Sequence, residues 1–162
     1  MDLTMINFRK ITENNFDAII RMKRPEGENF VASNAVSLAQ AWLYRDDNDV
    51  FPFAIYDDDT VVGFMLLEED MEDKRLDLWR IMLPPENEGK GYGTAAVKLI
   101  IKYAKEAGKY DSIGLLCGPE NHNARHIYDK LGFLPTGEIC YGDVEMRLDL
   151  RGDKDDNTAR DQ

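Results

Sequence analysis

The chain has 162 residues and a formal net charge of -11, because 31 Asp and Glu outnumber 20 Lys and Arg. This length predicts about one domain with a single buried core, and the negative charge argues against nucleic acid as a partner. Two cysteines without metal-ligand spacing and two histidines offer almost no material for a metal site. Because the chain has neither a secretory h-region nor an apolar run of about 18 residues, we expect no membrane association and a cytoplasmic location.

Acidic residues gather in three runs, at 46–49, 57–59 and 68–73. Such runs are typical of solvated loops, and we expect these to be loops. An acidic surface would also concentrate a cationic substrate such as a polyamine.

The first third of the chain predicts one strand and two helices. Residues 3–10 alternate as a strand, and Thr12 is expected to cap a helix that ends at 24–27. Ser33 is expected to cap a second helix that reaches Tyr44. The apolar stripes expected to face the core are Phe16, Ile19, Ile20 and Met22 in the first helix, and Val36, Ala39 and Leu43 in the second.

Strands are predicted at 51–56 and 61–67, joined as a hairpin across a polar turn. A third strand is expected at 76–83. It is followed by a non-helical connection at 84–87, because prolines 84 and 85 cannot donate backbone hydrogen bonds.

A glycine-rich loop leads into the helix predicted at 94–107. In that helix Val97, Ile100, Ile101 and Ala104 form an apolar stripe, and Gly108 is expected to end it. Gly89, Gly91 and Gly93 alternate there, so backbone N–H groups can approach an anion at the positive end of the helix. Lys90 adds a cation, and Thr94 adds a hydroxyl and a backbone N–H. This chemistry suits a diphosphate.

Other classes of glycine loop fit less well. Residues 91–96 match the degenerate dinucleotide pattern GxGxxA, with Glu120 as a ribose-binding acid, and a turn without ligand is a further alternative. A dinucleotide fold usually opens with its motif, whereas about half of this chain precedes the loop. The Walker spacing GxxxxGK[ST] is absent.

The remaining elements are a strand at 112–117, a helix at 121–131 and two strands at 134–139 and 143–150. Residues 151–162 are nearly devoid of apolar side chains and are expected to form an acidic disordered tail. We therefore expect one domain over residues 1–150.

Two stretches resemble motifs of the GNAT family of N-acetyltransferases. The sequence Leu-Trp-Arg-Ile-Met at 78–82, followed by the loop 88–94, resembles motif A, whose signature is Gln/Arg-x-x-Gly-x-Gly/Ala. Residues 121–133 resemble motif B. Together with 29–34 and 37–41, the 78–82 strand most resembles bacterial diamine and polyamine (spermine/spermidine) acetyltransferases. The resemblance implies an α/β fold with a mixed, mostly antiparallel sheet flanked by helices.

The resemblance also implies a site for acetyl-CoA as cosubstrate and no metal. Backbone groups of the 76–83 strand would pair with the pantetheine arm and polarise the thioester carbonyl. Asn121 would contact that arm, although helix capping alone also explains it. Glu88 departs from the motif, which carries Gln or Arg at this position. A carboxylate beside a diphosphate is repulsive. The predicted cofactor-binding residues are Ile81, Met82, Leu83, Glu88, Gly89, Lys90, Gly91, Tyr92, Gly93, Thr94 and Asn121.

Tyr128 would donate a proton to the departing thiolate, with a buried structural tyrosine as the alternative. The amine must lose a proton, often through water held by a carboxylate. Glu28 and Asp77 are the candidates we favour for this base, and Glu26 and Asp143 are alternatives. Trp42, Tyr44 and Trp79 could line an amine pocket, but we expect them in the core.

We therefore expect an N-acetyltransferase that moves an acetyl group to a primary amine by direct attack in a ternary complex. A polyamine or diamine such as spermine or spermidine is the favoured acceptor. Protein or antibiotic amines, and a non-catalytic acyl-CoA-binding module, are the alternatives. A homodimer is an expected assembly.

Overall fold

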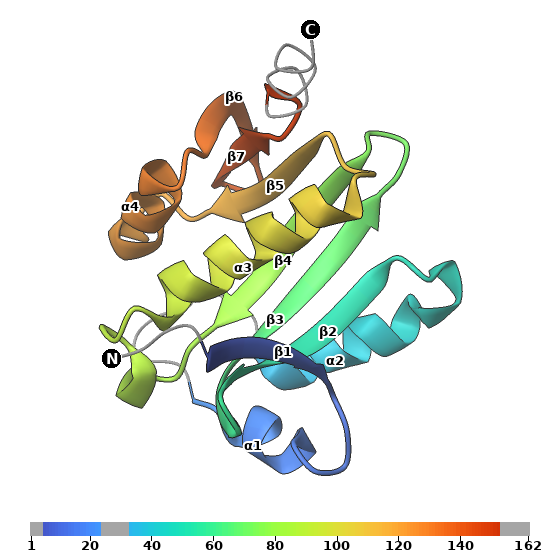
Figure 1. The fold of residues 1–162 in the computed structure, drawn as a ribbon, viewed down its shortest axis with the longest axis vertical. Helices are drawn as coiled ribbons and strands as arrows, with labels where there is room; N and C mark the ends of the chain where they lie inside the picture. The colour runs from blue at the N-terminus through green and yellow to red at the C-terminus, as the bar shows by residue number, and fades with distance from the viewer. Residues whose placement is uncertain (1–4, 24–32, 153–162) are drawn as a thin grey trace, which may run out of the picture. The chain divides into compact units, whose positions relative to one another are not determined.

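The computed structural model describes residues 5–23 and 33–152 (Figure 1). Its seven strands form one sheet with the order β1-β2-β3-β4-β5-β7-β6, and the pairs β1–β2, β2–β3, β5–β7 and β6–β7 are antiparallel. This mixed α/β architecture confirms the predicted fold class. The strands are β1 (Ile6–Lys10), β2 (Val50–Asp57), β3 (Thr60–Asp70), β4 (Arg75–Met82), β5 (Ser112–Cys117), β6 (Leu134–Cys140) and β7 (Asp143–Asp149).

The α-helices are α1 (Phe16–Arg21), α2 (Asn34–Leu43), α3 (Tyr92–Ala107) and α4 (His122–Lys130), and the short 3-10 helices are η2 (Arg45–Asp47) and η3 (Pro85–Asn87). The element order therefore matches the predicted order. None of the helices in the described ranges is long and apolar enough to cross a membrane.

The chain divides into two compact units. One comprises Met1–Glu68 and Leu78–Ile100, and the other comprises Glu69–Asp77 and Ile101–Gln162. The single domain expected over 1–150 stays a prediction. From residue 153, the predicted tail lies outside the described residues, as does the break expected at 24–27.

The first unit has its core between α1, α2 and the β2–β3 hairpin. Ile19, Phe64 and Leu66 are fully buried there, and Leu38 and Ala41 of α2 pack against this cluster. The hairpin forms as predicted, with its two turn residues at 58 and 59. Asp58 has a φ of 54°, the left-handed conformation that a tight hairpin turn requires.

The start of α1 differs from the prediction. Asn15, not Thr12, is the N-cap residue, and the helix begins at Phe16. The Asn15 side chain closes the preceding turn, because its Oδ1 accepts from Thr12 N at 2.8 Å and its Nδ2 donates to Lys10 O at 3.0 Å. Phe16 and Ile20 are exposed, so of the expected stripe only Ile19 is fully buried.

The face of α2 that is buried also differs from the prediction. Ser33 caps the helix as expected, with its Oγ accepting from Val36 N at 3.3 Å. However, Val36 is 47% exposed and Leu43 is 65% exposed, while Asn34 and Ser37 are buried. The covered face follows the spacing 34, 37, 38 and 41. Leu38 and Ala41 pack on the core of this unit, and Ser37 accepts a hydrogen bond from Arg80 on β4.

The connection after β4 is helical, contrary to the prediction. Pro84 is extended and Pro85 opens the 3-10 helix η3, where a missing N–H removes no hydrogen bond. The helix α3 then begins two residues earlier than predicted and ends at Gly108, whose φ is 68°. The predicted stripe of α3 is buried at Val97, Ile100 and Ala104.

Candidate active site

The glycine loop is anchored to the β2–β3 hairpin at two points. Asn87 Nδ2 donates to Val62 O at 3.1 Å, just before the loop. Tyr92, which starts α3, is buried, and its hydroxyl donates to Asp57 Oδ2 at 2.8 Å. This bond to the Asp57 carboxylate raises the pKa of the Tyr92 phenol. Both ends of the loop are therefore held on the sheet.

Within the loop, Gly89 and Gly91 take the left-handed conformation, with φ of 72° and 84°. A Cβ at Gly89 would meet no atom within 4 Å, so the backbone there is open to a ligand. The first bond of α3 runs from Ala95 N to Gly91 O at 3.0 Å. The N–H groups of residues 92–94 precede it and lack partners within the helix, which suits an anion.

The charged side chains of the loop, on Glu88 and Lys90, are exposed. Gly93 and Thr94 lie in the first turn of α3 rather than before it, and both are half-buried. Since the Tyr92 side chain is engaged with Asp57, only its backbone N–H remains for a diphosphate. The loop thus brings together the seven predicted cofactor residues from 88 to 94.

At the end of β4, Met82 is buried while Ile81 and Leu83 are half-buried. Gly63 on β3 gives this segment its space, because a Cβ there would lie 2.8 Å from Met82 O and 2.7 Å from Leu83 Cδ2. The segment can therefore pack against β3 without a side chain between them. The predicted pairing of residues 81–83 with pantetheine stays a prediction.

Asn121 caps α4, as its Oδ1 accepts from Ala124 N at 3.3 Å. The capping role is therefore observed, and the contact with pantetheine stays a prediction. His122 and His126 on the same helix are exposed.

Tyr128 on α4 is 7% exposed and packs edge-on against Phe133, with ring centroids 5.7 Å apart. Burial, with a smaller effect from Cys117, raises the pKa of the Tyr128 phenol well above its ordinary value. In the part of the chain that the structure describes, no hydrogen-bond partner of this hydroxyl is found. A neutral phenol that has kept its proton can act as a proton donor.

Of the two candidate bases, Asp77 lies among the described residues. Glu28, and the alternative Glu26, lie outside the described residues. Asp77 is half-buried, and its carboxylate accepts from Arg75 Nε at 2.7 Å and from Arg75 Nη2 at 3.2 Å. Asp77 therefore has a structural partner, and its role as a base stays a prediction.

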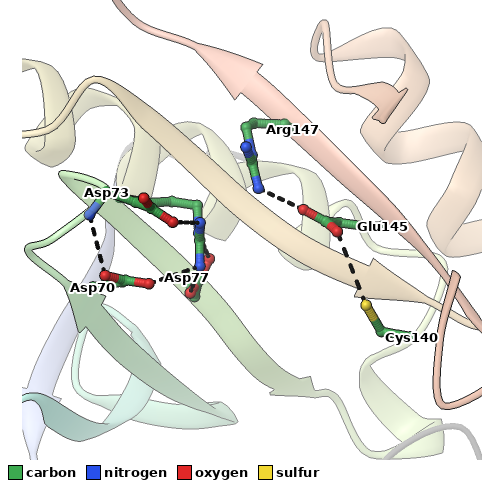
Figure 2. A network of polar contacts seen from close by, with 7 residues as sticks. Asp70, Asp73, Asp77, Cys140, Glu145 and Arg147 are labelled. Atoms are coloured by element: carbon green, nitrogen blue, oxygen red, sulfur yellow. Dashed lines mark hydrogen bonds and ion pairs between the residues drawn. The ribbon is translucent and has the colours of Figure 1, made fainter. Parts of the chain in front are cut away.

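Asp77 belongs to a network in the β3–β4 turn (Figure 2). Arg75, whose side chain is 17% exposed, also bonds Asp73 at 2.9 Å and Asp70 at 3.1 Å. Beside it, Glu69 Oε1 accepts from the Tyr110 hydroxyl at 2.7 Å and from Lys109 Nζ at 3.0 Å. The expectation of a merely solvated acidic loop is wrong here, because these carboxylates hold buried or half-buried groups.

The three aromatic residues considered for an amine pocket are not a core cluster. Trp42 is 68% exposed and Tyr44 is 40% exposed, whereas Trp79 is half-buried and packs on the core of the first unit. Arg45 lies over the Trp42 ring at 3.8 Å from its centroid. The rings of Tyr44 and Trp79 have centroids 6.4 Å apart. The core expectation holds only for Trp79.

Between α2 and β4, Arg80 Nη1 donates to Ser37 Oγ at 3.1 Å and to Gln40 Oε1. Burial lowers the pKa of this guanidinium. Among the described residues, no group of three or more His, Cys, Asp or Glu is arranged to hold a metal ion.

Sequence reasoning missed three polar residues of this region. Asn87 and Asp57 anchor the glycine loop, and Asn34 lies buried beside Met82. Asn87 adjoins the loop in sequence and could have been noticed. Asp57 lies in the acidic run 57–59 and Asn34 ends the stretch 29–34, but their contacts with Tyr92 and Met82 arise only through the fold.

Comparison with known proteins identifies a family that the chain matches. A model described as the acetyltransferase (GNAT) family matches residues 16–133. The spermine/spermidine N(1)-acetyltransferase of Bacillus subtilis (strain 168) is 26% identical over 150 residues, which cover 88% of this chain and 97% of that protein. The spermidine N(1)-acetyltransferase of Escherichia coli (strain K12) is 34% identical over 89 residues, 55% of this chain and 48% of that protein.

Among solved structures, the spermidine N-acetyltransferase from Vibrio cholerae in complex with CoA and spermine has the same fold, with a TM-score of 0.73. It is 20% identical, and the match covers 91% of this chain and 97% of that one.

Proposed function

The chain belongs to the acetyltransferase (GNAT) family, and we propose that it moves the acetyl group of acetyl-CoA to a primary amine of a polyamine or diamine, such as spermine or spermidine. The family match confirms the predicted family and the N-acetyltransferase class. The observation that carries the choice of acceptor is the similarity to the Bacillus subtilis spermine/spermidine enzyme over 88% of the chain. The net charge of -11 also favours a cationic acceptor.

In this proposal the loop 88–94 holds the diphosphate of acetyl-CoA. The supporting features are the two left-handed glycines and the N–H groups of residues 92–94, which have no partner within α3. Backbone groups of residues 81–83 pair with the pantetheine arm and polarise the thioester carbonyl. Asn121 contacts the same arm with the part of its amide that does not cap α4.

The neutral amine attacks the thioester carbon directly in the ternary complex. The C–N bond forms, the C–S bond breaks, and the thiolate takes a proton from the Tyr128 hydroxyl. A tyrosine phenol carries its proton at neutral pH and so has one to give to the thiolate. Glu28 or Asp77 accepts the proton of the amine, directly or through water.

A thiol-release assay with acetyl-CoA and a panel of amines tests the acceptor class. The panel comprises spermine, spermidine, putrescine, peptides and aminoglycosides. We expect kcat/KM for the polyamines to exceed that for the other amines by about tenfold or more. A preference for peptides or aminoglycosides would instead support one of those acceptors. Coenzyme A binding without turnover of any amine would support a non-catalytic module.

The proposed chemistry needs no metal, because backbone donors and Tyr128 supply what the reaction requires. We expect the purified enzyme to keep its kcat within about twofold after dialysis against EDTA. Activity lost on dialysis and restored by a divalent cation would contradict this. A cytoplasmic location and a homodimer belong to the same proposal, and light scattering of the purified protein measures the assembly.

A further inference from the structure

Asn34, the first residue of α2, is one of three buried polar or charged residues among those described. It is 3% exposed and lies between α1 and the end of β4. Its Nδ2 donates to Ile19 O at 2.9 Å. Because a carbonyl oxygen can only accept, this bond fixes which end of the amide is nitrogen.

Among the described residues, the other end of the Asn34 amide has no partner. Within the described part of the chain, no hydrogen-bond donor reaches Asn34 Oδ1. The amide is flanked by Met22 Sδ at 3.6 Å and Met82 Sδ at 3.7 Å from its nitrogen, and thioether sulfurs cannot donate. A buried acceptor left unpaired is costly, and native structures seldom keep one without a reason.

Asn15 shows the usual arrangement for such a residue. It is 2% exposed, almost as buried as Asn34, and both ends of its amide are bonded. Its Oδ1 accepts from Thr12 N, and its Nδ2 donates to Lys10 O. The two asparagines thus differ in one respect, the unused oxygen of Asn34.

We propose that Asn34 Oδ1 accepts a hydrogen bond from an N–H of the bound acceptor amine, which makes Asn34 a substrate-binding residue. This inference rests on the proposed function. Its geometric basis is the position of Asn34 beside Met82, inside the 81–83 segment assigned to the thioester. The amine must shed water to attack, and its N–H groups then need an acceptor.

The pantetheine amide is a less suitable donor for this oxygen. The backbone of residues 81–83 has both N–H and C=O groups, so an extended arm that pairs with it can be satisfied by the backbone alone. The acceptor amine cannot form such a series of backbone hydrogen bonds. A side-chain acceptor close to Met82 supplies what the amine lacks.

The test compares Asn34→Leu with Asn15→Leu in steady-state kinetics with spermidine and acetyl-CoA. We expect Asn34→Leu to raise the KM for spermidine about tenfold, as for one lost hydrogen bond, and to leave the KM for acetyl-CoA unchanged. Asn15→Leu removes two buried bonds, so it should lower Tm while leaving both KM values unchanged. Asn34→Asp keeps an acceptor oxygen and should retain a spermidine KM closer to that of the wild type.

Asn34→Ser provides the same test if the leucine variant does not fold, because its hydroxyl is too short to replace the amide oxygen. An unchanged spermidine KM in folded Asn34→Leu or Asn34→Ser would overturn the inference, and so would a rise in the acetyl-CoA KM alone. If the wild type acetylates another amine instead, the polyamine proposal fails, and the same comparison with that amine still decides the role of Asn34. A wild type that turns over no amine overturns both.

Discussion

The turn from Glu69 to Asp77 and the loop from Pro84 to Thr94 flank the same strand, β4, yet they use their polar groups in opposite ways. In the turn, Arg75 bonds three carboxylates and Glu69 bonds Tyr110 and Lys109. In the loop, the ends are anchored while backbone N–H groups at the start of α3 are left for a ligand. The charged side chains of the turn therefore bond one another, whereas the loop keeps backbone N–H groups that have no partner within α3.

Substitutions of two buried tyrosines, one with a catalytic role proposed and one with a structural role, should differ most in their effect on activity. Tyr128 has no hydroxyl partner among the described residues, whereas the Tyr110 hydroxyl is bonded to Glu69. Tyr128→Phe should lower kcat by about 100-fold or more and leave the KM for acetyl-CoA within about twofold, because the proton is needed only as the thiolate leaves. Initial rates measure both constants.

Tyr110→Phe is the matched control. It should leave kcat unchanged and lower the free energy of unfolding by about 1–3 kcal/mol, as for a buried hydrogen bond to a charged group. Equal kcat in the two variants would remove Tyr128 from its assigned role.

Alanine substitutions at two left-handed glycines should have the next largest effect, on the KM for acetyl-CoA. Gly89 in the loop has a φ of 72° and Gly108 at the end of α3 has a φ of 68°, and a Cβ at either would meet no atom within 4 Å. Alanine at either position should cost about 1–2 kcal/mol of stability through backbone strain. Only Gly89→Ala should raise the KM for acetyl-CoA, by about tenfold, because its Cβ obstructs the approach of the diphosphate to the backbone. Equal KM values in the two variants would contradict a diphosphate at this loop.

A substitution at Gly114 tests whether the Arg75 network stabilises the turn. A Cβ there would lie 2.4 Å from Asp77 Oδ1 and 2.9 Å from Arg75 Cδ, so Gly114→Ala must displace this ion pair. We expect a loss of about 1–3 kcal/mol in urea unfolding. Gly152→Ala, where a Cβ has open space, should stay within about 0.5 kcal/mol of the wild type. Equal stability of the two variants would show that the Arg75 network does not hold the turn.

The pH dependence of stability should show the smallest effect. Burial raises the pKa of the Glu69 carboxyl, but bonds from Tyr110 and Lys109 and the charge on Lys109 outweigh it, so the net pKa is below its ordinary value. A lowered carboxyl pKa stabilises the fold above the unfolded pKa, and this contribution is lost as pH falls through the folded pKa. Between about pH 6 and about pH 3, the wild type should therefore lose more free energy of unfolding than Tyr110→Phe. Parallel losses would contradict this.

Most of the fold was predictable because periodicity marks elements directly. The strand at 112–117 and the stripe of α3 were placed correctly from apolar spacing, and Ser33 and Gly108 were recognised as helix ends. The buried face of α2 was not predictable, because apolar Val36 and Leu43 lie outside while Asn34 and Ser37 lie inside. That choice depends on where β4 places Arg80, which is a long-range contact.

The candidate site was predictable where a local motif carries it and not elsewhere. Alternating glycines before a helix predict a backbone cradle from a few neighbouring residues. The anchors of that loop on Val62 and Asp57 join residues 25 and 35 positions apart, and the buried position of Asn34 depends on its contacts with Ile19 and Met82. Sequence patterns of single residues contain no signal for such contacts.

The most direct test of the central proposal is the product formed from acetyl-CoA and spermidine, separated by chromatography and identified by mass spectrometry. We predict singly acetylated spermidine in amounts equal to the coenzyme A released. The rate of its formation should be proportional to the concentration of wild-type enzyme and should be strongly reduced with Tyr128→Phe. Coenzyme A released without acetylated spermidine, or a protein that binds acetyl-CoA and leaves spermidine unchanged, would contradict the proposal.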